Sequence, residues 1–183
     1  MLNNALVPVL GFVAPSGTGK TQLLKTLITR LRAKGLRLGV IKHSHHDVEI
    51  DAPGKDSFEL RQAGATQTLV AGKQRWALIT ELDEPAAEAD LDALLRHLDQ
   101  TALDLILVEG FKHVPFAKIE VYRAATYAQR PEHAPLFETD ADIIAVASDV
   151  PLATKNPVTV LDLNDSEQIA RFILQHFSLP TTQ

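Results

Sequence analysis

Two glycines, a lysine and a threonine near the amino terminus have the types and spacing that bind a phosphorylated ligand. In the run Ala-Pro-Ser-Gly-Thr-Gly-Lys-Thr, residues 14–21, Gly17 and Gly19 let the backbone curl so that successive N–H groups face one anion. Lys20 supplies a point charge for the β- and γ-phosphates, and the Thr21 hydroxyl is a ligand for Mg²⁺. We expect this loop to bind a nucleoside triphosphate with magnesium through Pro15, Ser16, Gly17, Thr18, Gly19, Lys20, Thr21 and Gln22.

The flanking residues supply the elements that such a loop needs. Residues 7–13 are almost all apolar, which is typical of a strand buried on both faces. Residues 20–34 place leucines and an isoleucine at helical spacing. The order strand, glycine-rich loop, helix is the context that makes the Gly-Lys-Thr run a phosphate-binding loop. The usual pattern begins with glycine where this chain has Ala14, and the plainer alternative is a glycine-rich turn that caps an ordinary helix.

A second stretch, residues 103–110, predicts an apolar strand that ends in Glu109 and Gly110. An acid at the carboxyl end of a strand beside the phosphate loop is typical of a Walker B strand, where it holds Mg²⁺ directly or through water. Many buried strands end in an acid, so this interpretation depends on the loop. We expect Lys20 and Glu109 to be the catalytic residues and Thr21 and Glu109 to be the metal ligands.

A polar segment follows the strand expected over residues 36–43. It contains several histidines, acids and lysines, and a short helix is expected over residues 56–63. Three interpretations stay open: a metal site, a loop that closes over nucleotide or substrate, and a purely structural loop. A lysine directly before that helix is also a second candidate anion site. The candidate residues for loop closure or for contact with a partner or cofactor are Lys42, His43, His45, His46, Asp47, Asp51, Lys55 and Asp56.

Asp149 follows another apolar strand, over residues 142–147. Its carboxylate could accept hydrogen bonds from N1 and N2 of guanine, a donor pattern that adenine does not offer. The alternative is an aspartate that starts the turn before Pro151.

The order of these elements predicts an α/β fold, a P-loop NTPase-like sandwich with a mainly parallel central sheet and an inserted β-hairpin over residues 66–71 and 75–80. In such a sheet the nucleotide lies at the carboxyl ends of the strands. We expect one nucleotide-binding domain over residues 1–177 and a frayed tail over 178–183. Residues 123–137, which are polar and contain prolines, are expected to be irregular.

Composition narrows the classes of function. The chain has 183 residues, 45% of them hydrophobic, a formal net charge of −5 and no cysteine. The absence of cysteine excludes disulfides and thiolate metal sites and is compatible with a reducing cytoplasm. The negative charge argues against nucleic acid as the main partner. No apolar run approaches the roughly 20 residues of a membrane-spanning helix.

Beyond the loop, several motifs resemble the MobB family of molybdopterin-guanine dinucleotide biosynthesis adaptor proteins. They cover most of residues 6–177 and are most specific between residues 40 and 65. Alanine in place of the first glycine of the loop fits this family's pattern. The motifs are Val-Ile-Lys-His (40–43), His-His-Asp (45–47), Pro-Gly-Lys-Asp-Ser (53–57), Gln-Ala-Gly-Ala (62–65), Arg-Trp-Ala-Leu (75–78), Leu-Ile-Leu-Val-Glu-Gly-Phe-Lys (105–112) and Ile-Ala-Val-Ala-Ser-Asp (144–149).

The resemblance implies a cytoplasmic protein that binds GTP and Mg²⁺, hydrolyses GTP slowly and forms a homodimer through extended sheet elements. It also implies a partner, a MobA-type guanylyltransferase that attaches GMP to molybdopterin, with molybdopterin or a molybdoenzyme as further candidate partners. Neither a nucleic acid nor a membrane is implied. The alternative functions are a small-molecule kinase on the same fold and a partner-binding module whose loop holds only an anion.

Overall fold

The computed structural model describes residues 2–44, 48–82 and 88–180. The chain divides into two compact units, one formed by residues 1–43 with 90–183 and the other by residues 44–89. The expectation of a single domain over residues 1–177 stays a prediction.

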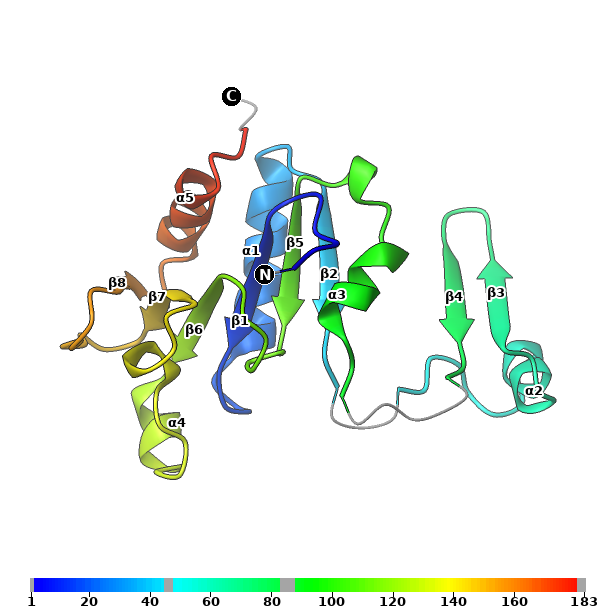
Figure 1. The fold of residues 1–183 in the computed structure, drawn as a ribbon, viewed down its shortest axis with the longest axis horizontal. Coiled ribbons are helices and arrows are strands. Elements are labelled where there is room, and N and C mark those ends of the chain that lie inside the picture. Colours follow the sequence, from blue (N-terminus) through cyan, green and yellow to red (C-terminus); the bar gives the residue numbers. More distant parts are fainter. Residues whose placement is uncertain (1, 45–47, 83–87, 181–183) are drawn as a thin grey trace. The chain divides into compact units, whose positions relative to one another are not determined.

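The first unit is built on a sheet of six strands (Figure 1), all paired in parallel in the order β2-β5-β1-β6-β7-β8. The strand that leads into the glycine-rich loop, β1, therefore lies between β5 and β6 near the middle of the sheet. The strands are β1 (Val9–Val13), β2 (Leu38–Lys42), β5 (Leu105–Glu109), β6 (Lys118–Tyr122), β7 (Ile143–Ser148) and β8 (Thr159–Asp162).

Successive side chains of a strand point to opposite faces of the sheet, and a different set of helices covers each face. Leu10 and Phe12 of β1 point to the face that packs against α1 (Lys20–Ala33) and α5 (Ser166–His176). Val9 points to the other face, where α3 (Leu91–Leu94) and the short 3₁₀ helix η1 (Leu95–His97) cover it. Because both faces are buried, β1 is apolar throughout, as its sequence predicts.

The segment after β6 differs from its expected irregular course. It contains a short helix, α4 (Ala124–Ala128), and a 3₁₀ turn, η3 (Leu136–Glu138). The buried Glu120 carboxylate of β6 holds both, because it accepts hydrogen bonds from the Tyr127 hydroxyl and from the backbone N–H groups of Leu136 (3.0 Å) and Phe137 (2.7 Å). Burial raises the pKa of Glu120 despite these donors. The segment is thus fixed to the sheet by a buried side chain of the strand that directly precedes it.

The second unit contains α2 (Asp56–Gln62) and the antiparallel hairpin of β3 (Gln67–Ala71) and β4 (Trp76–Thr80). No residue of these two strands is buried within the chain. Arg61 of α2 organises this unit: its guanidinium pairs with Glu81 at 2.7 Å, with Glu49 at 2.7 Å and with Asp51 at 2.9 Å.

The α/β class, the mainly parallel sheet and the inserted hairpin are confirmed. At the carboxyl terminus, the Leu179 N–H donates to the Leu174 carbonyl at 2.9 Å and its side chain packs against the core that contains α5. None of the described helices is both long enough and apolar enough to cross a membrane.

Candidate nucleotide-binding site

The glycine-rich loop joins β1 to α1 and curls as its sequence predicts. Gly17 has φ +88° and Gly19, the N-cap of α1, has φ +93°. No neighbouring atom would obstruct a side chain at Gly17, so it is the backbone angle that favours glycine there. The Thr18 hydroxyl turns inward and donates to the Pro15 carbonyl at 3.0 Å, and Thr18 is fully buried. The loop is therefore closed on itself at the amino-terminal end of a helix of 14 residues.

Lys20 folds back over this loop. Its Nζ donates to the Ala14 carbonyl at 2.8 Å and to the Pro15 carbonyl at 3.2 Å. Partial burial lowers the pKa of Lys20, Glu109 opposes that shift and Lys42 adds to it. Among the described residues the hydrogen-bond acceptors of this half-buried ammonium are two neutral carbonyls, and an anionic ligand would supply a closer counter-charge.

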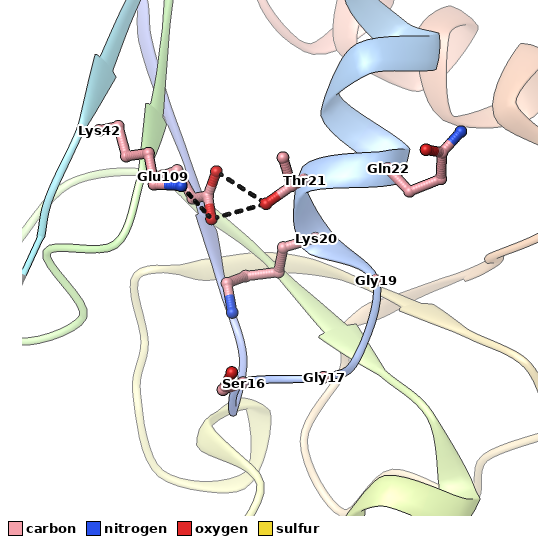
Figure 2. A pocket seen from close by; sticks show the side chains of 8 residues that line it. All are labelled: Ser16, Gly17, Gly19, Lys20, Thr21, Gln22, Lys42 and Glu109. Carbon is pink, nitrogen blue, oxygen red and sulfur yellow. Dashed lines mark hydrogen bonds and ion pairs between the residues drawn. The ribbon is translucent and has the colours of Figure 1, made fainter.

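Glu109 and Thr21 meet because both lie on the α1 face of the sheet. Leu105 and Leu107 of β5 pack against the α1 core, so Glu109, two residues further on, points the same way. The Thr21 hydroxyl donates to the Glu109 carboxylate, 3.1 Å from Oε1 and 3.3 Å from Oε2 (Figure 2). Lys42 pairs with Glu109 across the β2–β5 register, with Nζ 4.0 Å from Oε1.

These side chains surround a pocket of about 400 Å³ at the carboxyl ends of β1, β2 and β5. The pocket offers a hydroxyl and a carboxylate side by side, which are the hard oxygen ligands that Mg²⁺ prefers. It also offers two lysines and the loop backbone for an anion. The donor set therefore fits a magnesium-bound polyphosphate. The lining residues are Ser16, Gly17, Gly19, Lys20, Thr21, Gln22, Lys42 and Glu109.

An unusual turn follows Glu109 and fixes its position. Gly110 and Phe111 both have positive φ, +100° and +54°. The turn lets the Phe111 ring stack on His43, with ring centroids 4.6 Å apart, while the His43 N–H donates to the Glu109 carbonyl at 2.9 Å. A Cβ at position 110 would lie 2.8 Å from the His43 Cβ. Glycine is therefore required by the backbone angle and by the close approach of His43.

Asp149 lies at the end of β7 and already has protein partners. Its Oδ1 accepts from the Ala124 N–H at 2.9 Å, and its Oδ2 lies 3.5 Å from Nη1 of Arg123. Arg123 in turn donates from Nε to the Thr18 carbonyl of the phosphate loop at 3.2 Å. Sequence reasoning did not place Arg123 in the site. The one feature of the sequence that points to Arg123 is its position directly after strand β6, which lies beside β1 in the sheet.

The polar segment after β2 divides between several places. Lys42 lines the pocket, and His43 supports the turn after Glu109. In the second unit Asp51 is an ion-pair partner of Arg61, Lys55 is the N-cap of α2 and Asp56 is its first residue. His45, His46 and Asp47 lie outside the described residues. Among the residues that the structure describes, no group of three or more histidines and acids is arranged to hold a metal ion.

Comparisons with known proteins agree with this architecture. A family model described as "MobB: Molybdopterin guanine dinucleotide synthesis protein B" matches residues 9–149. The chain is 52% identical over 175 residues to the molybdopterin-guanine dinucleotide biosynthesis adapter protein of Escherichia coli, covering 96% of each chain. It is 43% identical to the adapter protein of Haemophilus influenzae, covering 95% of this chain and 93% of that one.

The fold also matches that of solved structures. The crystal structure of Bacillus subtilis MobB superimposes with a TM-score of 0.70 at 22% identity, over 93% of this chain and 98% of that chain. At this identity the match concerns the fold alone. The family model and the two relatives cover most of the chain, including the phosphate loop and Glu109. The chain belongs to the MobB family of molybdopterin-guanine dinucleotide biosynthesis adapter proteins.

Proposed function

We propose that this chain is a GTP-binding adaptor that hydrolyses GTP slowly and assists the conversion of molybdopterin to molybdopterin guanine dinucleotide. The observation that carries the nucleotide part is the convergence of Lys20, Thr21 and Glu109 on one pocket at the glycine-rich loop. The pathway part is supported by the name of the Escherichia coli relative, which is identical at 52% of the aligned positions.

Each pocket residue has a role that follows from its chemistry. Thr21 and Glu109 would hold Mg²⁺, which supplies charge neutralisation at the phosphates. Lys20 would exchange the carbonyls of Ala14 and Pro15 for phosphate oxygens and so gain an anionic partner. The loop N–H groups and the start of α1 would bind the same phosphates. Lys42 would add a second cation at the edge of the pocket.

Slow hydrolysis is consistent with the small number of acidic side chains that line this pocket. Among the described residues that line it, Glu109 is the one carboxylate, and it is engaged with Thr21. No second lining acid is therefore placed to orient an attacking water.

We propose guanine recognition by Asp149. A carboxylate offers about four lone-pair positions, and its described partners are Ala124 and Arg123. Capacity remains for two donors from a guanine edge.

The hairpin of the second unit supports a homodimer. Trp76 is 67% exposed and Leu69 is 62% exposed within the chain, and two strands alone are marginally stable in water. A second copy would cover these apolar side chains and extend the two-stranded sheet. We further propose a cytoplasmic location and a MobA-type guanylyltransferase as partner, with molybdopterin or a molybdoenzyme meeting the polar segment around residues 42–56.

The test is calorimetric titration of GTP and ATP in Mg²⁺ with the full chain. We expect GTP to bind more tightly than ATP, and Lys20→Ala to weaken GTP at least about tenfold, because a charge-assisted contact is lost. Lys25→Ala, on the exposed side of the same helix, is the matched control and should bind as the parent does. If Lys20→Ala bound GTP as tightly as the parent, the proposal would be wrong.

A second assay separates adaptor from kinase. The protein is incubated with γ-labelled GTP or ATP and candidate organic acceptors. Label recovered as inorganic phosphate supports slow hydrolysis, whereas label in an organic acceptor favours the kinase.

A further inference from the structure

Arg123 connects the glycine-rich loop with the residue that follows β7, two places that are far apart in sequence. Its Nε donates to the carbonyl of Thr18 in the phosphate loop at 3.2 Å, and its Nη1 lies 3.5 Å from Oδ2 of Asp149. The second terminal nitrogen lies 3.8 Å from the place that a Cβ on Gly19 would take. One guanidinium therefore lies against the phosphate loop and against the residue at the end of β7.

The contact with Thr18 bears on the shape of the loop. A peptide group is planar and trans, so its C=O and N–H point in opposite directions. Because the Thr18 carbonyl is turned toward Arg123, the N–H of Gly19 is turned away from it. Gly19 lines the pocket, and its N–H is one of the donors that a phosphate-binding nest presents. Arg123 thus fixes the orientation of a ligand-binding amide from behind the loop.

Arg123 is itself held on a rigid support. It follows β6 directly and is the N-cap of α4. The Ala124 N–H donates to Asp149, and Tyr127 of α4 donates to the buried Glu120. Strands β6 and β7 pair side by side up to their carboxyl ends. A change at Asp149 therefore reaches the Arg123 side chain through one ion pair.

We propose that Arg123 is a positioning residue that couples Asp149, at the end of β7, to the phosphate loop. With Asp149 in place, the guanidinium is directed onto Thr18 and the loop keeps its anion-binding shape. Without the Asp149 charge, the guanidinium loses one of its two anchors and the loop binds polyphosphate less tightly. The proposal rests on the proposed function, since it requires the loop to bind a nucleotide.

The test uses tripolyphosphate with Mg²⁺ as a ligand that has no base. Such a ligand gives Asp149 no guanine to contact, so Asp149 can influence it only through its charge or through Arg123. The variant is Asp149→Asn, which keeps an acceptor for the Ala124 N–H and removes the negative charge. Its effect on tripolyphosphate affinity is measured by calorimetry in the parent chain and in an Arg123→Ala background.

We expect Asp149→Asn to weaken tripolyphosphate binding in the parent by about fivefold, which corresponds to the loss of one hydrogen bond that contributes about 1 kcal/mol. In the Arg123→Ala background the same change should leave affinity equal or slightly higher, because only the removal of a negative charge near a polyanion remains. Equal fold-changes in the two backgrounds would overturn the proposal. So would a rise in affinity that requires Arg123, because the guanidinium would then act as a phosphate ligand itself.

Two further variants keep the test independent of folding defects. Arg123→Lys keeps the charge, but one ammonium cannot replace a fork that bridges Thr18 and Asp149, so the coupling should vanish as in Arg123→Ala. Arg130→Ala is the control, because no described hydrogen bond or ion pair joins the Arg130 side chain to the loop, and it should preserve the coupling. A parent chain that binds no GTP defeats both proposals, whereas GTP binding without coupling defeats this inference alone.

Discussion

Replacing Gly110 by alanine is the perturbation whose cost can be worked out most directly. Gly110 has φ +100°, a conformation that costs an L-residue roughly 1–2 kcal/mol. The new Cβ would lie 2.8 Å from the Cβ of His43. That atom is fixed to the backbone and cannot rotate away, so overpacking adds about 1–3 kcal/mol. We expect the free energy of unfolding to fall by about 2–5 kcal/mol, a large part of the roughly 5–15 kcal/mol of a typical domain.

The assay is equilibrium urea denaturation followed by circular dichroism at fixed protein concentration. The matched control is Gly39→Ala, also in the first unit, whose Cβ would lie 2.8 Å from Cδ1 of Leu103, 3.2 Å from Cγ1 of Ile106 and 3.4 Å from Cδ1 of Leu98. Gly39 has no positive φ and these atoms all belong to side chains, so we expect overpacking alone, a loss of about 1–2 kcal/mol. If Gly110→Ala cost no more than Gly39→Ala, the turn that positions Glu109 would not have the geometry described here.

Three further predictions concern the site, the acid side of the stability curve and the hairpin. Glu109→Gln should weaken GTP binding about tenfold in Mg²⁺ and strengthen it in EDTA, because the charge that holds the metal also repels the phosphates. Calorimetry measures both affinities, and weaker binding in both conditions would contradict the role of Glu109 as a metal ligand. Hydrogen bonds from Arg37 lower the pKa of Asp104 to about 2 from 3.8, so this pair stabilises the fold above about pH 4 and is lost as pH falls through about 2. Asp104→Asn should therefore flatten the pH dependence of urea midpoints between pH 4 and 2, and an unchanged slope would refute this. For the proposed homodimer, a dimeric mass is expected by light scattering, and Trp76→Lys should lower it to that of a monomer; a dimeric mass that this change leaves unaltered would contradict an interface at the hairpin.

Local patterns were enough to predict the curled glycine-rich loop and its flanking elements, while its binding of phosphate stays a prediction. Gly17 and Gly19 have the positive φ angles that the motif requires, and a buried strand and a helix lie on either side as predicted. The prediction for Glu109 needed the loop as well as its strand, and the structure places Glu109 beside Thr21 because a parallel sheet brings strand ends together at one edge.

The contacts that sequence could not supply depend on which strands are neighbours. Arg123 reaches Thr18 because β6 lies beside β1, and it reaches Asp149 because β7 lies beside β6. No spacing in the sequence encodes that order. A separate reason applies to α4: it has no apolar periodicity of its own, and its Tyr127 is fixed by Glu120, a buried acid of the preceding strand β6.

The central claim is that the loop between β1 and α1 binds a magnesium-bound nucleoside triphosphate together with Glu109. The most direct measurement is a crystal structure with Mn²⁺ in place of Mg²⁺ and a non-hydrolysable GTP analogue, with the metal located by its anomalous signal. We predict metal density at the Thr21 hydroxyl and the Glu109 side, with Lys20 moved from the Ala14 carbonyl to a phosphate oxygen. Nucleotide bound elsewhere, or Lys20 still on the Ala14 carbonyl beside it, would contradict the account.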